Sequence, residues 1–190
     1  MSGEPREPEL RDATLASGPP TLGAARPASP EAYYPGAMGR PHPGPERVRL
    51  SRAIRDAILA HARAELPKEA CGLVIGSDAP AAGGRALRWE PARNALASPY
   101  RYEIDPQDLL RLTIEIDDAG ETIWGIVHSH VLSPARPSPT DVRAALYPDA
   151  LYLLVSMDPA EADDDGPSVR AWRIVSEAVH EVALEVEDVG

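Results

Sequence analysis

The feature that most constrains the fold is an apolar run that ends in His128-Ser129-His130. Side chains alternate between the two faces of an extended strand, so His128 and His130 project side by side while Ser129 points away. Asp141 follows after a proline-rich connection. Two imidazoles and one carboxylate form a three-ligand set suited to catalytic zinc, with a fourth position left for water.

A second carboxylate, upstream in the chain, can serve as the general base that such a metal site needs. Glu69 precedes a short apolar run that ends at Gly76 and that reads as a buried strand. Taken alone, a glutamate at such a position is more often a solvated strand end. Together with the histidines and Asp141, Glu69 becomes the candidate general base.

Length and composition restrict the class of protein. The 190 residues are 43% hydrophobic, which is enough for one packed domain with a tail. The formal net charge of −11 argues against a nucleic-acid partner, because phosphate binding needs a basic surface. Cys71 is the single cysteine and excludes an intrachain disulfide. No apolar run approaches the roughly 20 residues of a membrane span, and the N-terminus lacks the apolar segment of a signal peptide. We therefore expect a soluble, cytoplasmic protein.

The chain divides near residue 46. Residues 1–46 are rich in proline, glycine and charge, and they lack a helical or strand pattern. Such a segment buries too little apolar surface to offset the entropy of ordering it, so disorder is predicted. Residues 47–190 are the predicted domain, and the sequence leaves the role of the extension open.

Hydrophobic periodicity and capping residues predict the elements of this domain. Ser51 is a plausible N-cap for a helix that Pro67 ends, and Thr140 is a plausible N-cap for a short helix that contains Asp141. A further helix is predicted from residue 105 or 106 to about 119. The predicted strands are 69–76, 86–91, 100–104, a strand ending at His130, 151–155, 169–175 and 179–186.

The combined motif is more specific than any of its residues. It reads His-x-His, seven intervening residues, Ser, two residues and Asp, with a glutamate upstream at the start of an apolar strand. This pattern resembles the JAMM (MPN+) signature of zinc metallopeptidases at every defining position, and the resemblance extends from about residue 48 to 186. The positions that carry it are Glu69, His128, His130, Ser138 and Asp141.

The resemblance implies a fold and a mechanism. The implied fold is the α/β, cytidine-deaminase-like JAB/MPN fold, in which helices flank a curved, mixed and mostly antiparallel sheet. His128, His130 and Asp141 would hold Zn²⁺, which lowers the pKa of a bound water to about 7. Glu69 would take the proton of this water and pass it to the leaving amine. Ser138 would donate a hydrogen bond to the developing oxyanion.

Further stretches are similar to small bacterial JAB-domain peptidases. They include the residues around Glu69 and a loop with Asn94, Ser98 and Tyr102. Among these peptidases, the chain resembles actinobacterial ones that remove cysteine from the C-terminus of a ubiquitin-like sulfur carrier in a thiocarboxylate-dependent route of cysteine biosynthesis. The implied partner is a small carrier that ends in Gly-Gly. Its tail would enter as an extended strand at a sheet edge, with Asn94, Ser98 and Tyr102 as candidate substrate-binding residues.

Two alternatives stay open. One is a deubiquitinase-like JAMM isopeptidase that acts on another ubiquitin-like modifier. The other is a non-catalytic MPN scaffold, which the intact Glu, His, His, Ser and Asp set opposes. The identity of the released amine separates the two enzymes, and metal content separates both from the scaffold. The sequence does not determine whether the chain forms a homodimer.

Overall fold

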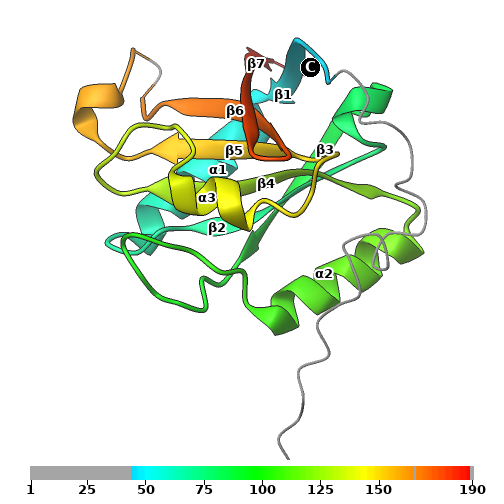
Figure 1. Cartoon of the computed structure of the whole chain (residues 1–190), viewed down its shortest axis with the longest axis horizontal. Coiled ribbons are helices and arrows are strands. Elements are labelled where there is room, and N and C mark those ends of the chain that lie inside the picture. Colours follow the sequence, from blue (N-terminus) through cyan, green and yellow to red (C-terminus); the bar gives the residue numbers. More distant parts are fainter. Residues whose placement is uncertain (1–43, 165, 189–190) are drawn as a thin grey trace, which may run out of the picture. The chain divides into compact units, whose positions relative to one another are not determined.

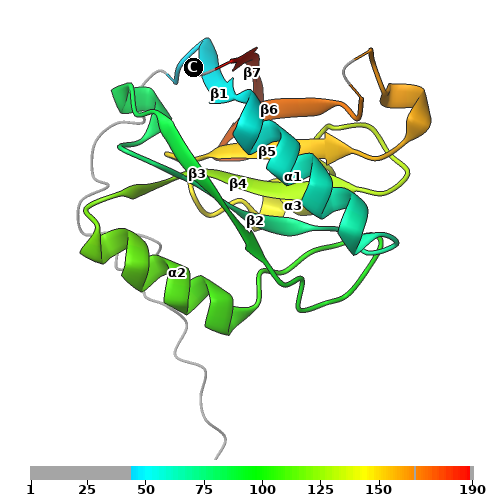
Figure 2. The same cartoon turned by 180° about the vertical axis from the view of Figure 1, so that it is seen from behind.

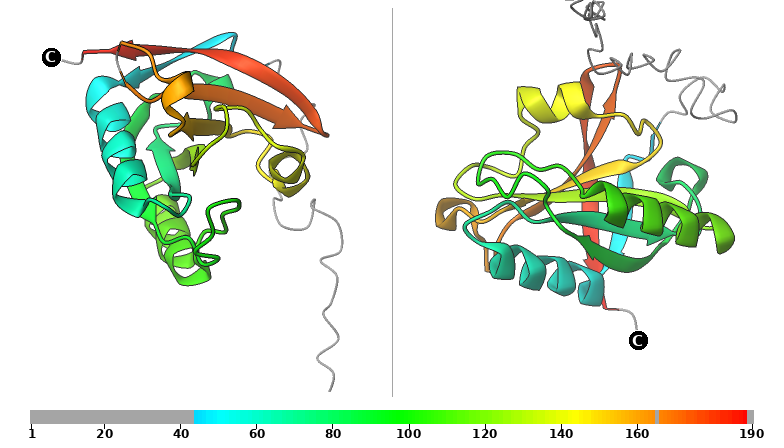
Figure 3. Two further views of the ribbon diagram at one scale, coloured as in Figure 1. Left: turned by 90° about the vertical axis from the view of Figure 1, so that its left-hand side faces the viewer. Right: turned by 90° about the horizontal axis from the view of Figure 1, so that it is seen from below.

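A mixed sheet forms the centre of the protein. The computed structural model describes residues 44–164 and 166–188, and within them seven strands form one sheet in the order β1-β7-β6-β5-β4-β2-β3 (Figure 1). The β1–β7 and β4–β5 pairs are parallel, and the other neighbours are antiparallel. The sheet is curved (Figure 3), as predicted, and its mixed strands together with the helices along the chain confirm the predicted α/β class. The strands are β1 (Arg47–Ser51), β2 (Cys71–Gly76), β3 (Ala86–Ala92), β4 (Thr122–His130), β5 (Leu151–Ser156), β6 (Val169–Val175) and β7 (Ala178–Glu187).

Three α-helices of the described residues flank this sheet. They are α1 (Arg52–Glu65), α2 (Pro106–Asp118) and α3 (Pro139–Ala144). The Ser51 hydroxyl accepts a hydrogen bond from Ile54 N at 3.3 Å, which confirms the predicted cap of α1. Helix α1 lies across one face of the sheet (Figure 2), and α3 lies over the opposite face (Figure 1). Within the described ranges, two short 3-10 helices, Pro80–Ala82 and Pro159–Glu161, lie in connections.

Each face of the sheet has its own apolar core. Ile58 of α1 packs into one core with Val74 and Leu153, whereas Leu112 of α2 packs into the other with Leu73 and Leu154. Neighbouring residues of β2 and β5 thus enter opposite cores, because a strand alternates its side chains. This explains why both strands are almost entirely apolar and are wholly buried.

Two local predictions were wrong. Residues 100–104 were expected to form a strand, but they belong to a loop whose backbone pairs only through one bridge, between Asn94 and Ile104. The short helix α3 is capped by Ser138 and not by Thr140, because Pro139 occupies its first position and the Ser138 hydroxyl accepts a hydrogen bond from Asp141 N.

The N-terminal extension is largely outside this description. Residues 1–43 of the predicted disordered segment 1–46 lie outside the described residues, so that prediction and the domain boundary stay predictions. Among the described residues, no helix has the length and apolar character needed to cross a membrane.

Candidate metal centre and active site

Strand β4 and helix α3 bring the three predicted ligands together. Within the described residues, His128, His130 and Asp141 each offer a ligand atom, and these atoms lie within 4.8 Å of one another. His128 and His130 point to one face at the end of β4. Ser129 points to the other face, where its hydroxyl accepts a hydrogen bond from Ala70 N at 2.8 Å. The alternation expected from the sequence is therefore present.

The spacing of these atoms suits a metal ion. His128 Nε2 lies 3.5 Å from one carboxylate oxygen of Asp141, and His130 Nε2 lies 3.5 Å from the other. Two ligands that each lie about 2.0–2.1 Å from a tetrahedral zinc are roughly 3.3–3.4 Å apart. In addition, both ring nitrogens of the fully buried His128 have no hydrogen-bond partner among the described residues. A buried imidazole without a partner is costly, and a metal ion at Nε2 would satisfy one nitrogen.

The two histidines have different surroundings. His130 Nδ1 lies 2.7 Å from the Pro134 carbonyl oxygen, a distance at which Nδ1–H donates and leaves Nε2 with a lone pair for a metal. Burial lowers the pKa of His128, although the Asp141 carboxylate opposes this, so the neutral form is favoured. Burial by itself would lower the pKa of His130, but the Asp141 carboxylate and the Pro134 carbonyl outweigh this effect and raise the pKa.

Helix α3 fixes the orientation of Asp141. One of its carboxylate oxygens accepts a hydrogen bond from Ser138 N at 2.7 Å, while the Ser138 hydroxyl accepts one from Asp141 N at 3.2 Å. This reciprocal pair is a capping box, which holds the carboxylate at the N-terminal turn of the helix. Burial raises the pKa of Asp141, but His128, His130 and Ser138 outweigh it and hold the pKa well below its usual range. Asp141 is therefore ionised, which suits a candidate metal ligand and does not suit a proton carrier.

Glu69 lies beside this set in a different environment. It precedes β2, is 5% exposed, and lines a cavity of about 230 Å³ together with His130, Ser138 and Asp141. Burial raises the pKa of Glu69 to about 7; His130 opposes this rise and Asp141 adds to it. A carboxyl group with a pKa near neutrality can both accept and donate a proton, which is the property that a general acid–base needs.

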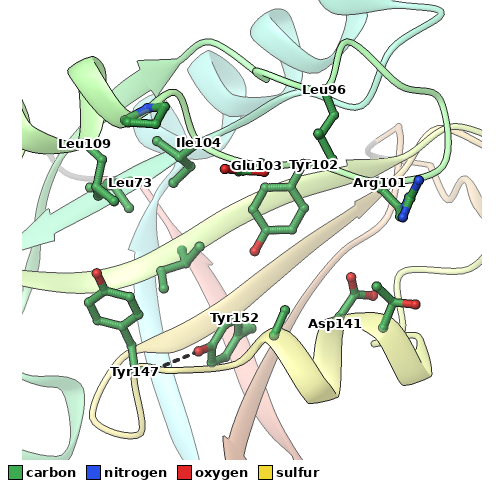
Figure 4. A pocket seen from close by; sticks show the side chains of 14 residues that line it. Leu73, Leu96, Arg101, Tyr102, Glu103, Ile104, Leu109, Asp141, Tyr147 and Tyr152 are labelled. Carbon is green, nitrogen blue, oxygen red and sulfur yellow. Dashed lines mark hydrogen bonds between the residues drawn. The ribbon is translucent and has the colours of Figure 1, made fainter. Parts of the chain in front are cut away.

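A second cavity meets the first at Asp141. This larger cavity, of about 440 Å³, lies between the loop that follows β3 and the chain around α3 (Figure 4). Tyr102 and Tyr152 enter it from opposite walls, and Tyr152 Oη accepts a hydrogen bond from Tyr147 N at 3.0 Å. Its walls are largely apolar, with Arg101 and Glu103 as the charged residues besides Asp141; the other lining residues include Leu73, Leu96, Ile104 and Leu109.

The three candidate substrate-binding residues occupy different positions. Tyr102 stacks on His128, with ring centroids 4.3 Å apart and planes 19° apart. Ser98 is half-buried, and its hydroxyl accepts a hydrogen bond from Tyr100 N. Asn94 is buried beneath the loop, and its amide makes four hydrogen bonds to backbone groups, at Glu69 O, Arg101 O, Leu96 N and Glu103 N. Its side chain is thus fully used inside the protein and organises the loop from 94 to 103.

Replacing Asn94 is therefore expected to destabilise the protein. Asn94→Ala leaves two backbone carbonyls and two backbone N–H groups without a partner, and we expect a loss of about 2–4 kcal/mol in the free energy of unfolding. Denaturant titration measures this loss. Asn94→Asp is the matched variant, since it keeps the hydrogen-bond acceptor and loses the donors. Its free energy of unfolding should lie between those of wild type and Asn94→Ala. An unchanged midpoint for Asn94→Ala would contradict this role.

Two supports of the site were not identified from the sequence. The Pro134 carbonyl that orients His130 comes from the backbone, which a residue pattern does not reveal. The stacking of Tyr102 on His128 joins residues that are 26 positions apart in the chain. Asn94 carried a local signal, because asparagine side chains commonly hydrogen-bond to the backbone in turns.

Comparisons with known proteins agree with this geometry. The family model of prokaryotic homologues of the JAB domain matches residues 51–175. The CysO-cysteine peptidase of Mycobacterium tuberculosis is 40% identical over 131 residues, which cover 69% of this chain and 85% of the relative. A desampylase of Haloferax volcanii is 36% identical over 118 residues, 59% of this chain and 82% of the relative. The solution structure of a Desulfitobacterium hafniense protein superposes with a TM-score of 0.64 at 31% identity, covering 75% of this chain and 94% of the other.

Proposed function

The chain belongs to the prokaryotic JAB family, and from this premise we propose that it is a zinc-dependent peptidase that hydrolyses the amide at the C-terminal tail of a ubiquitin-like sulfur carrier and releases cysteine. One observation carries the proposal. His128, His130 and Asp141 converge to metal-binding distances, and Glu69 lies in the cavity that two of them line. The relatives named CysO-cysteine peptidase and desampylase support a peptidase that acts on such conjugates.

The chemistry divides among the residues of the site. Zinc, when held by His128, His130 and Asp141, supplies a Lewis acid that polarises a carbonyl and makes water more acidic. Glu69 takes a proton from the attacking water and returns it to the amine nitrogen as the C–N bond breaks. Each cycle consumes one water and yields the carrier carboxylate and free cysteine.

Ser138 and Tyr102 have supporting roles in this proposal. The Ser138 hydroxyl accepts a hydrogen bond at the helix cap, a role that does not use its own hydrogen. That hydrogen can be donated to the oxygen that becomes negative in the transition state. Tyr102 covers one face of the His128 ring and so keeps water from this ligand. Asn94 and Ser98 shape the loop beside Glu69, since Asn94 binds Glu69 O and Ser98 O accepts a hydrogen bond from Glu69 N.

The partner is proposed to be a small carrier that ends in Gly-Gly. The larger cavity is a largely apolar space that reaches Asp141. Glycines next to the reacting carbonyl would let an extended tail approach the metal closely. An isopeptidase that acts on another ubiquitin-like modifier is the second candidate, and the desampylase relative favours it. A thiocarboxylate-dependent role in cytoplasmic cysteine synthesis belongs to the first candidate.

The released amine tests the proposal. We expect the zinc-loaded protein to cleave a CysO protein that carries a C-terminal cysteine, with a loss of one cysteine residue in the mass spectrum. A CysO protein joined through an isopeptide bond to a lysine side chain serves as the competing substrate. Cleavage of the lysine conjugate alone would favour the isopeptidase. Cleavage of neither substrate would contradict a peptidase for this class of carrier.

A further inference from the structure

We propose that the smaller cavity receives the residue that leaves, and that Tyr100 and Leu132 determine how well this residue is bound. This inference rests on the proposed function, since it assigns the two sides of the scissile bond to the two cavities. The tail of the carrier would then occupy the larger cavity. The two spaces meet at Asp141, which lines both of them.

The position of Glu69 determines which end of the substrate lies in which cavity. The group that protonates the leaving nitrogen must come within hydrogen-bond reach of that nitrogen. Glu69 lines the smaller cavity and does not line the larger one. The nitrogen, and the residue attached to it, must therefore lie on the side of the smaller cavity.

The size of the two cavities agrees with this direction. The smaller cavity has a volume of about 230 Å³, below the roughly 300–1,000 Å³ of pockets that hold drug-sized ligands. It suits a single amino-acid residue such as cysteine. The larger cavity, of about 440 Å³, has room for several residues of an extended tail.

The walls of the smaller cavity present apolar surface to its occupant. Tyr100 is 84% exposed and Leu132 is 79% exposed, which places two large apolar side chains in solvent at the entrance of the site. Pro99 and Val131 extend this surface. A cysteine side chain that enters the cavity would cover part of this apolar surface, and removing apolar surface from water favours binding.

Both walls are held in place before any substrate arrives. On one side, Ser98 O accepts a hydrogen bond from Glu69 N at 2.9 Å, and the Ser98 hydroxyl accepts one from Tyr100 N at 3.1 Å. On the other side, the hydroxyl of Ser156 donates to Ser133 O at 2.8 Å. The backbone of these two segments is thus tied to Glu69 and to β5, so little backbone entropy is lost when the cavity fills.

The test compares two substrates that differ only in the leaving group. The first is a CysO protein with a C-terminal cysteine, and the second is a CysO protein whose C-terminal carboxyl is a primary amide, which releases ammonia and leaves the cavity empty. For Tyr100→Ala and Leu132→Ala we expect kcat/KM to fall about 10-fold on the cysteine substrate and to stay unchanged on the primary amide. Both side chains are exposed, so both variants should fold.

Leu96→Ala is the matched control, because Leu96 is in the same loop as Tyr100 but lines the larger cavity. It should lower kcat/KM on both substrates by the same factor. The inference is overturned if Tyr100→Ala and Leu132→Ala cleave the cysteine substrate with the kcat/KM of wild type. It is also overturned if their kcat/KM falls by the same factor on both substrates. Wild-type protein that cleaves neither substrate overturns the proposed function, and this inference with it.

Discussion

Glu69→Gln should lower the hydrolysis rate by about 10²–10⁴, with the upper part of that range expected because one residue serves both proton transfers. Glutamine keeps the shape of the buried side chain and removes its ability to accept a proton. The metal ligands are untouched, so zinc content and fold should be retained. Single-turnover hydrolysis of the CysO–cysteine substrate, with zinc measured on the same preparation, gives both quantities.

Glu115→Gln is the matched control, since Glu115 is an exposed residue of α2 that lines neither cavity. It should hydrolyse the substrate at the wild-type rate. Loss of a general base should lower the rate far more than threefold. A Glu69→Gln variant whose hydrolysis rate is within about threefold of the wild-type rate would therefore show that another group is the base.

The second large effect is the loss of the metal itself. His128→Ala and Asp141→Ala each remove one of the three proposed ligands, so both variants should lose zinc and with it all measurable turnover. His180→Ala and Asp149→Ala are matched controls, because both residues are exposed and lie outside the site. Elemental analysis after dialysis at neutral pH gives the zinc content. Stoichiometric zinc in both ligand variants would refute this ligand assignment.

The arrangement of the candidate metal site was predictable because it depends on short-range rules. Alternation along β4 places His128 and His130 on one face, and that rule needs no knowledge of the rest of the chain. Asp141 was expected in the first turn of a helix, and it lies there at the third helical position. Glu69 was the candidate base because it precedes an apolar strand upstream of this set, and the resemblance to zinc metallopeptidases supported that assignment.

The loop after β3 was less predictable. Tyr100 to Ile104 has the alternation and the β-favouring residues of a strand, and so a strand was expected. The structure instead wraps this segment around the amide of Asn94, which satisfies two of its backbone groups, Arg101 O and Glu103 N. A buried side chain thus replaced a neighbouring strand as the hydrogen-bond partner, a competition that periodicity does not reveal.

The N-cap of α3 is a second feature that the sequence pattern did not identify. Ser138 and Thr140 both have side chains that can cap a helix, and Thr140 was the cap predicted from the sequence. Pro139 decides between them, because it fits the first helical position and has no N–H to satisfy. The consequence is chemical as well as structural. Ser138 N donates a hydrogen bond to the carboxylate of Asp141, so the cap that begins the helix also orients the proposed metal ligand.

The most direct test measures zinc content and hydrolysis of the CysO–cysteine substrate on wild type, Glu69→Gln and Asp141→Ala purified in parallel without chelators. Wild type should hold one zinc per chain and release cysteine. Glu69→Gln should hold zinc and release none, and Asp141→Ala should hold no zinc and release none. Cysteine release by zinc-free Asp141→Ala would contradict a metal-dependent peptidase, and loss of zinc from Glu69→Gln would make Glu69 a ligand instead of the base.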